Sequence, residues 1–152
     1  MGQYRKIKKD GVRMKELEKE VYNFIEKELR DYKDNLKKLK ELELEIVEAS
    51  GTSDGQPRGN QTSNPTEAKT IKLITTKRLL KLHENVDAIK NVYDRLNQEY
   101  KEFFDANYTK PILYDKQSQI QKVCEATSIS DREYYRRRDK IVYAVATEMG
   151  YI

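Results

Sequence analysis

Hydrophobic residues recur every three or four positions between about Lys15 and Ala49. This spacing places them on one side of a helix, so the segment is predicted to form a long amphipathic helix with a narrow apolar stripe. The pair Asp34–Asn35 could interrupt it, and the pattern leaves open whether there is one helix or two. The stripe consists of Leu17, Val21, Phe24, Leu29, Tyr32, Leu36, Leu39, Leu42 and Ile46.

A second helical stripe follows a break in the pattern. Residues 50–64 contain three Gly, one Pro and many turn-forming residues, which predicts a loop. Asn64 and Pro65 then suit the N-cap and the first position of a helix. Two long helices joined by a loop predict an antiparallel helical hairpin over residues 15–98. The second stripe consists of Ile71, Ile74, Arg78, Leu82, Val86, Ile89, Tyr93 and Leu96, in which Arg78 is expected to reach solvent or an acid of the run Glu41 to Glu48.

The pattern of residues 99–152 predicts shorter helices. An aromatic-rich helix is expected to end near Asn107, before Pro111, and a helix of about ten residues is expected to end at Thr127. After a turn at Ser128–Ile129, Ser130 and Glu133 form a capping-box pattern that begins a last helix, which Gly150 stops. A helix, a short turn and a basic helix occur in the order of a DNA-binding helix-turn-helix. The expected fold is therefore all-α: a basic mobile arm (1–14), the hairpin (15–98) and a C-terminal helix-turn-helix domain (99–152).

Composition changes this picture in a few respects. Charged residues make up 37% of the chain, which suits solvated helices better than a sheet protein. Six basic residues within the first 15 positions, and five within 131–140, form local patches that suit phosphate binding. One Cys and one His, far apart, predict neither a disulfide nor a metal site, and no cofactor is expected. The sequence has no P-loop, no nucleophile–base pair and no long apolar run, so we expect a non-enzymatic cytoplasmic protein with no membrane partner.

The last helix supplies the candidate site. Ile129 is expected to fill the space between the two helices of the motif, facing Ile120, Val123 and Cys124. The buried face of the last helix is expected to carry Tyr134, Arg138, Ile141, Val145 and Met149, and the exposed face Arg132, Tyr135, Arg136, Asp139 and Tyr143. Arg132 and Arg136 are the candidates for base contacts, because Arg bonds guanine in a bidentate manner. Arg137 and Lys140 are candidate phosphate contacts, and Tyr135 a candidate sugar or phosphate contact.

Three segments resemble the RinA-type phage late transcriptional activators. They are residues 54–59 with 63–66 (DGQPRG and SNPT), a Lys-rich helix carrying Leu79, Leu82 and Ile89, and residues 130–141 (SDREYYRRRDKI). Glu133 departs from the family, which more often has Thr or Ser there. The resemblance covers about residues 25–150. It implies activation of late packaging and morphogenesis genes in a bacterial host cell, and a C-terminal domain from about Asn91 to Ile152 similar to the sigma-factor region that reads the promoter −35 element. It also implies that Arg132, Tyr135, Arg136 and Arg137 face double-stranded promoter DNA, with host RNA polymerase as a candidate partner.

Other interpretations stay open. Arg58 lies in a Gly-flanked turn and is a candidate phosphate or partner contact, or part of a plain connector. The hairpin could mediate homodimerisation. A small-terminase-like DNA-packaging protein would combine a similar DNA-binding domain with a ring-forming hairpin. A helical interaction protein acting on host RNA polymerase would not bind DNA at all.

Overall fold

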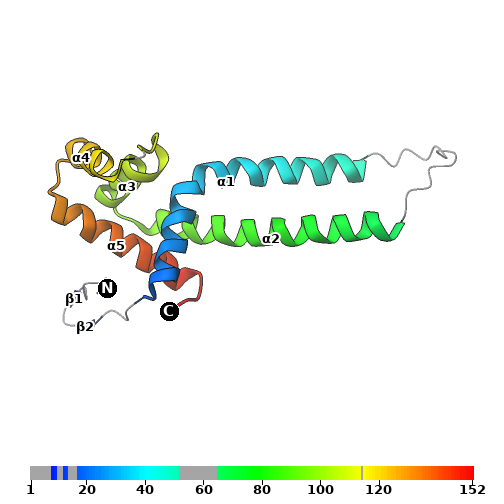
Figure 1. The fold of residues 1–152 in the computed structure, drawn as a ribbon, viewed down its shortest axis with the longest axis horizontal. Helices are drawn as coiled ribbons and strands as arrows, with labels where there is room; N and C mark the ends of the chain where they lie inside the picture. The colour runs from blue at the N-terminus through cyan, green and yellow to red at the C-terminus, as the bar shows by residue number, and fades with distance from the viewer. Residues whose placement is uncertain (1–7, 10–11, 14–16, 52–64, 114) are drawn as a thin grey trace.

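The computed structural model describes residues 8–9, 12–13, 17–51, 65–113 and 115–152, and within them the fold is all-α, as predicted (Figure 1). Its long helices are α1 (Lys19–Gly51) and α2 (Pro65–Arg95). Shorter ones follow as α3 (Gln98–Phe104), the π-helix η1 (Asp105–Thr109), α4 (Lys116–Thr127) and α5 (Asp131–Glu148). Much of α1 and α2 forms a projecting two-helix arm, and the other elements form a body at one end of it (Figure 1).

The N-terminal segment contains a small β-ladder. Strands β1 (Lys8–Lys9) and β2 (Val12–Arg13) pair antiparallel, with Lys8 opposite Arg13 and Lys9 opposite Val12. The expected basic arm, residues 1–14, otherwise lies outside the described residues, so its mobility stays a prediction.

Helix α1 is one continuous helix of 33 residues, which answers the question that Asp34–Asn35 left open. It changes direction near its middle: its first half crosses the body beside α5, and its second half runs antiparallel to α2 (Figure 1). Pro65 begins α2, as its fixed backbone angle φ favours. The expected N-cap Asn64 and the rest of the predicted loop, residues 52–63, lie outside the described residues.

The hydrophobic core lies in the body and draws on segments from both ends of the chain. Leu17, Tyr22, Ile25 and Leu29 pack in one cluster with residues of α2, α3, α4 and α5. Phe104, which is 1% exposed, is at its aromatic centre, in edge or tilted contact with Tyr32, Tyr93 and Tyr108. The expected division at residue 98 is therefore not a packing boundary, because α1 and the end of α2 complete the core of residues 99–152.

A π-helical turn and a buried polar network connect α3 to the last two helices. The Asn97 side chain caps α3 by accepting from the Tyr100 N–H. In η1, Asn107 is 1% exposed; its side-chain oxygen accepts from the Tyr134 hydroxyl at 2.9 Å, and its backbone carbonyl from Gln119 Nε2 at 3.2 Å. Because buried polar groups are costly unless bonded, these contacts fix η1 against α4 and α5. Sequence periodicity predicted this helix but not its π-helical end.

The α4–α5 connection has the predicted short turn. Asp115 caps α4 through the N–H groups of Gln117 and Ser118, and Ser128 ends it with a left-handed φ of 55°. Ile129 is partly buried against the core cluster, to which α4 contributes Ile120 and Val123 and α5 contributes Tyr134 and Ile141. Ser130 Oγ accepts from the Glu133 N–H at 3.2 Å, which confirms half of the predicted capping box. Gly150, at φ 85°, follows the end of α5, where glycine tolerates the left-handed backbone.

The left-handed backbone of Ser128 predicts a stability difference between two variants. We expect Ser128→Val to lower the free energy of unfolding by about 1–2 kcal/mol, because a branched Cβ clashes in this conformation. Ser128→Gly should leave it within about 1 kcal/mol of wild type, since Gly gains φ freedom but loses more entropy on folding. Urea denaturation measures both.

The control is Ala126→Val, which adds a branched side chain at an exposed position of regular helix in α4. Equal losses for Ser128→Val and Ala126→Val would show that the turn is not strained.

Candidate nucleic-acid interface

Three residues predicted to contact DNA form an exposed cluster on the first turns of α5. Arg132 is exposed, the Arg136 side chain is 57% exposed, and Tyr135 is 43% exposed. Tyr135 is held edge-on against Tyr134 at 5.5 Å, while its ring lies 5.0 Å from the Arg138 guanidinium. The structure thus brings Arg132, Tyr135 and Arg136 together at the end of α5 that follows the turn.

Arg137 is placed differently from the sequence prediction of a phosphate contact. Its side chain is only 12% exposed; its Nε donates to the Glu133 carboxylate at 3.1 Å, and a further ion pair joins it to Glu99 at 3.6 Å. Its guanidinium also lies 5.3 Å from the Tyr100 ring. In this conformation Arg137 packs α5 against α3, and Lys140, 5.5 Å from the same ring, shares that location.

Two residues expected on the exposed face of α5, Asp139 and Tyr143, are partly buried. The Tyr22 hydroxyl donates to the Asp139 carboxylate at 2.6 Å, and the Leu17 N–H donates to the Tyr143 hydroxyl at 3.2 Å. The start of α1 and the residues just before it therefore partly cover Asp139 and Tyr143, which the helical period alone had assigned to the exposed face. Burial is the main cause that raises the pKa of the Tyr22 phenol above its ordinary value. The Tyr22 hydroxyl therefore stays neutral at physiological pH and can donate to Asp139.

The predicted buried face is otherwise correct. Tyr134, Ile141 and Val145 are buried, and Met149 is partly buried. Arg138 lies at the edge of this face, with its guanidinium near the rings of Tyr22 and Tyr135. Val142 and Ala146 are buried too, because α5 is enclosed by α1 as well as by α2 and α4.

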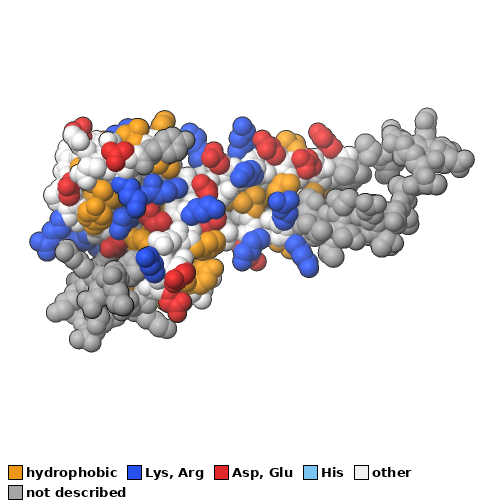
Figure 2. Space-filling model, viewed as in Figure 1, with side chains coloured by type: hydrophobic (Ala, Val, Ile, Leu, Met, Phe, Trp, Pro, Cys, Tyr) orange, Lys and Arg blue, Asp and Glu red, His pale blue; other side chains and the backbone are white. Residues whose placement is uncertain are grey.

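A cleft of about 500 Å³ opens between α1, α4 and α5, beside the exposed cluster. Basic side chains from three helices line it: Lys27 and Arg30 from α1, Lys116 from α4 and Arg138 from α5. Glu26 and Asp31 also line it, and Glu26 pairs with Arg30 at 3.2 Å. Lys27 and Lys116 are exposed and form no ion pair with any described residue. Basic side chains gather over this part of the body (Figure 2).

Sequence reasoning missed Lys27, Arg30 and Lys116. Lys27 and Arg30 lie about a hundred residues from α5, and no short motif links them to it. The only available signal was their position on the polar side of the α1 stripe, which they share with many other charged residues.

Two further residues were considered in the sequence, Arg58 and Cys124. Arg58 lies outside the described residues. Burial, with a hydrogen bond to Asp131, raises the pKa of the Cys124 thiol, which suits a packing role. Among the described residues, no group of three or more His, Cys, Asp or Glu side chains could hold a metal ion, and no helix is long and apolar enough to cross a membrane.

The hydrogen bond between Tyr22 and Asp139 is expected to stabilise the packing of α1 on α5. Tyr22→Phe should lower the free energy of unfolding by about 1.5–3 kcal/mol, because it removes a hydrogen bond to a charged group. Tyr151→Phe is the matched control, since Tyr151 is 45% exposed. Chemical denaturation measures both, and a Tyr22→Phe protein as stable as Tyr151→Phe would contradict this role.

The comparisons with known proteins add no relative: no protein-family model, no curated protein and no solved structure matches the chain. The resemblance to RinA-type activators therefore rests on the three sequence segments alone.

Proposed function

We propose that this protein binds double-stranded DNA and regulates transcription, with the first turns of α5 inserted into the major groove. The observation that carries the proposal is the cluster of Arg132, Tyr135 and Arg136. These residues are exposed at the N-terminal end of a helix that a short turn joins to α4. Recognition helices contact base edges with residues at this end.

The chemistry of the cluster suits base contact. Arg132 and Arg136 are one helical turn apart, so both guanidinium groups can reach one side of a groove. Arg136 pairs with Glu133 at 3.4 Å, but an exposed ion pair contributes only about 0–1 kcal/mol, so Arg136 can leave it at little cost. Two basic groups on neighbouring elements, Lys27 and Lys116, supply phosphate contacts that add affinity without reading sequence.

The regulatory role comes from the resemblance to RinA-type activators. It supports activation of late phage genes in the host cytoplasm, with host RNA polymerase as a protein partner. A second candidate, a helical interaction protein that does not bind DNA, is favoured by the exposed Leu44, Val47 and Leu80 on the arm. Binding to DNA separates the two, and a ring-sized mass in solution would instead indicate a packaging protein.

The first test concerns Arg136. Preferred duplexes are selected from a random pool with the wild-type protein, and binding to one of them and to a scrambled duplex is titrated by fluorescence anisotropy. Arg136→Ala should weaken binding to the preferred duplex about 10–100-fold, which corresponds to about 1–3 kcal/mol of base discrimination, and change binding to the scrambled duplex little. Lys90→Ala, an exposed change on α2, is the control.

Equal losses on both duplexes would show that Arg136 touches only phosphate. No measurable binding of wild type to any duplex would overturn the proposed function.

The second test concerns the cleft. Lys27→Ala and Lys116→Ala should each weaken binding to the preferred and the scrambled duplex by the same factor. Each should also reduce the slope of log affinity against log salt by about 0.9, the value for one phosphate contact. Unchanged slopes would show that the DNA backbone does not contact the cleft. They would not contradict the proposed contacts of Arg132, Tyr135 and Arg136.

A further inference from the structure

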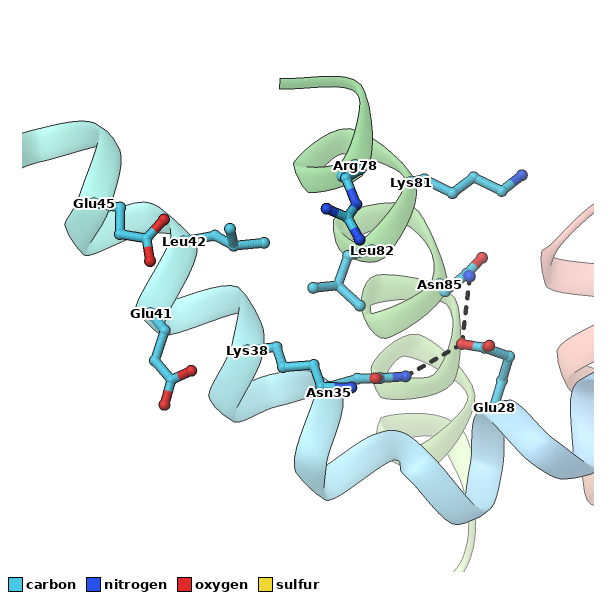
Figure 3. Close-up of a pocket in the computed structure, with 10 residues that line it drawn as sticks. All are labelled: Glu28, Asn35, Lys38, Glu41, Leu42, Glu45, Arg78, Lys81, Leu82 and Asn85. Atoms are coloured by element: carbon cyan, nitrogen blue, oxygen red, sulfur yellow. Dashed lines mark hydrogen bonds between the residues drawn. The ribbon is translucent and has the colours of Figure 1, made fainter. Parts of the chain in front are cut away.

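A second feature of the molecule lies on the arm, away from α5. A groove of about 590 Å³ runs between α1 and α2, and Figure 3 shows the side chains that line it. At its inner end the Glu28 carboxylate accepts from Asn35 Nδ2 and from Asn85 Nδ2, each at 3.3 Å. The bond from Asn85 joins α2 to α1, whereas the bond from Asn35 lies within α1. Further along the arm, Leu42 and Leu82 are only partly buried between them.

Along its outer part, the two edges of this groove have opposite charge. Glu41 and Glu45 of α1 line one edge, and Arg78 and Lys81 of α2 line the other (Figure 3). Lys38 of α1 also lines the groove, nearer its inner end beside Asn35. Residues 41–48 contain four Glu and no basic residue, whereas residues 77–82 contain three basic residues and no acid.

These four edge residues have no partner of opposite charge in the described part of the chain. All four are exposed. Among the described residues, the contact between an acidic and a basic side chain that crosses the arm here joins His83 Nε2 to the Glu43 carboxylate at 3.8 Å, and neither residue lines the groove. Arg78 was expected to reach solvent or an acid of the run Glu41 to Glu48, and it reaches solvent.

Among the described side chains of the arm, the buried hydrophobic residues are Leu39 of α1 and Val86 and Ala88 of α2. The α1 members of the main hydrophobic cluster end at Leu29, and the α2 members begin at Ile89. Three of the six exposed large hydrophobic residues in the described chain, Leu44, Val47 and Leu80, lie on the arm. A pair of helices with narrow stripes gains stability by packing on further helices.

We propose that the groove face of the arm binds the same face of a second copy of this chain, forming a four-helix bundle. The charge layout selects the symmetry. A twofold axis parallel to the arm places the acidic α1 edge of one copy over the basic α2 edge of its partner, twice. A twofold axis perpendicular to the arm would place acid over acid and base over base. Leu42 and Leu82 of both copies become buried, and the two bodies lie at the same end of the bundle.

This proposal does not depend on DNA binding, because its evidence lies entirely on the arm. It does specify an arrangement for the proposed function, since a twofold pair of bodies carries two copies of the exposed α5 cluster. Twofold proteins of this kind read paired half-sites.

A charge exchange tests the proposal. Variant one carries Glu41→Lys and Glu45→Lys, variant two carries Arg78→Glu and Lys81→Glu, and a third chain carries all four changes. Mass is measured by light scattering after size-exclusion chromatography, and helicity by circular dichroism. Wild type should have twice the chain mass of 18.0 kDa. Variants one and two should each be monomers, because every edge contact becomes repulsive.

The decisive sample is an equimolar mixture of variants one and two. In a mixed pair both edge contacts are again Lys or Arg against Glu, so the mixture should regain the dimer mass, as should the four-change chain. Loosening of the arm within one copy could not explain recovery in the mixture, because each chain there keeps two edges of like charge. The control is Lys40→Glu with Glu84→Lys, exposed charges that do not line the groove, and it should stay dimeric.

Three outcomes would overturn the proposal: a monomeric wild type at the highest soluble concentration, dimeric single variants, or a mixture that stays monomeric. A wild-type mass above that of a dimer would also overturn it, because the twofold arrangement closes at two copies. If one variant loses helicity, recovery in the four-change chain remains the test.

Discussion

The fold depends on the docking of the first half of α1 across α5. Ile25 and Leu29 are fully buried there, and the Tyr22 hydroxyl donates to Asp139 at 2.6 Å. Without α1, the core residues of α5 and α3 would lie open on that side. Helix α1 continues without interruption from this contact into the arm and changes direction near its middle, so its docked half anchors the base of the arm beside α5 (Figure 1).

Packing also decides what each arginine of α5 can do. Arg132 and Arg136 point to solvent at the first turns, while Arg137 lies against Tyr100 between Glu133 and Glu99. The Arg138 guanidinium lies near the rings of Tyr22 and Tyr135 and also lines the cleft between α1, α4 and α5. Three consecutive arginines thus divide into one exposed group and two packing groups, and only the exposed one suits base recognition.

The arm and the body contribute different physical properties. The body is a closed core with an exposed basic end, and electrostatic attraction to phosphate is strongest at such a concentration of charge. Among its described side chains the arm buries few hydrophobic residues, and Glu41 and Glu45 on one edge of its groove oppose Arg78 and Lys81 on the other, which suits self-association through complementary surfaces. A twofold pair joined along the arms would hold two α5 ends at a fixed separation.

The sequence alone predicted most of the helices, because periodicity, caps and breakers act locally, but not the continuity of α1 or the π-helical η1. Pro65, Ser130 and Gly150 lie at or next to helix ends as their backbone preferences require, and the stripes of α1 and α2 predicted the antiparallel hairpin. The sequence did not determine which polar residues stay exposed. Only the tertiary structure covered Asp139 and Arg137 and brought Lys27 beside Lys116, because these outcomes depend on which helix packs over which face. Helical periodicity fixes the faces of one helix, whereas contacts between distant segments decide which face meets solvent.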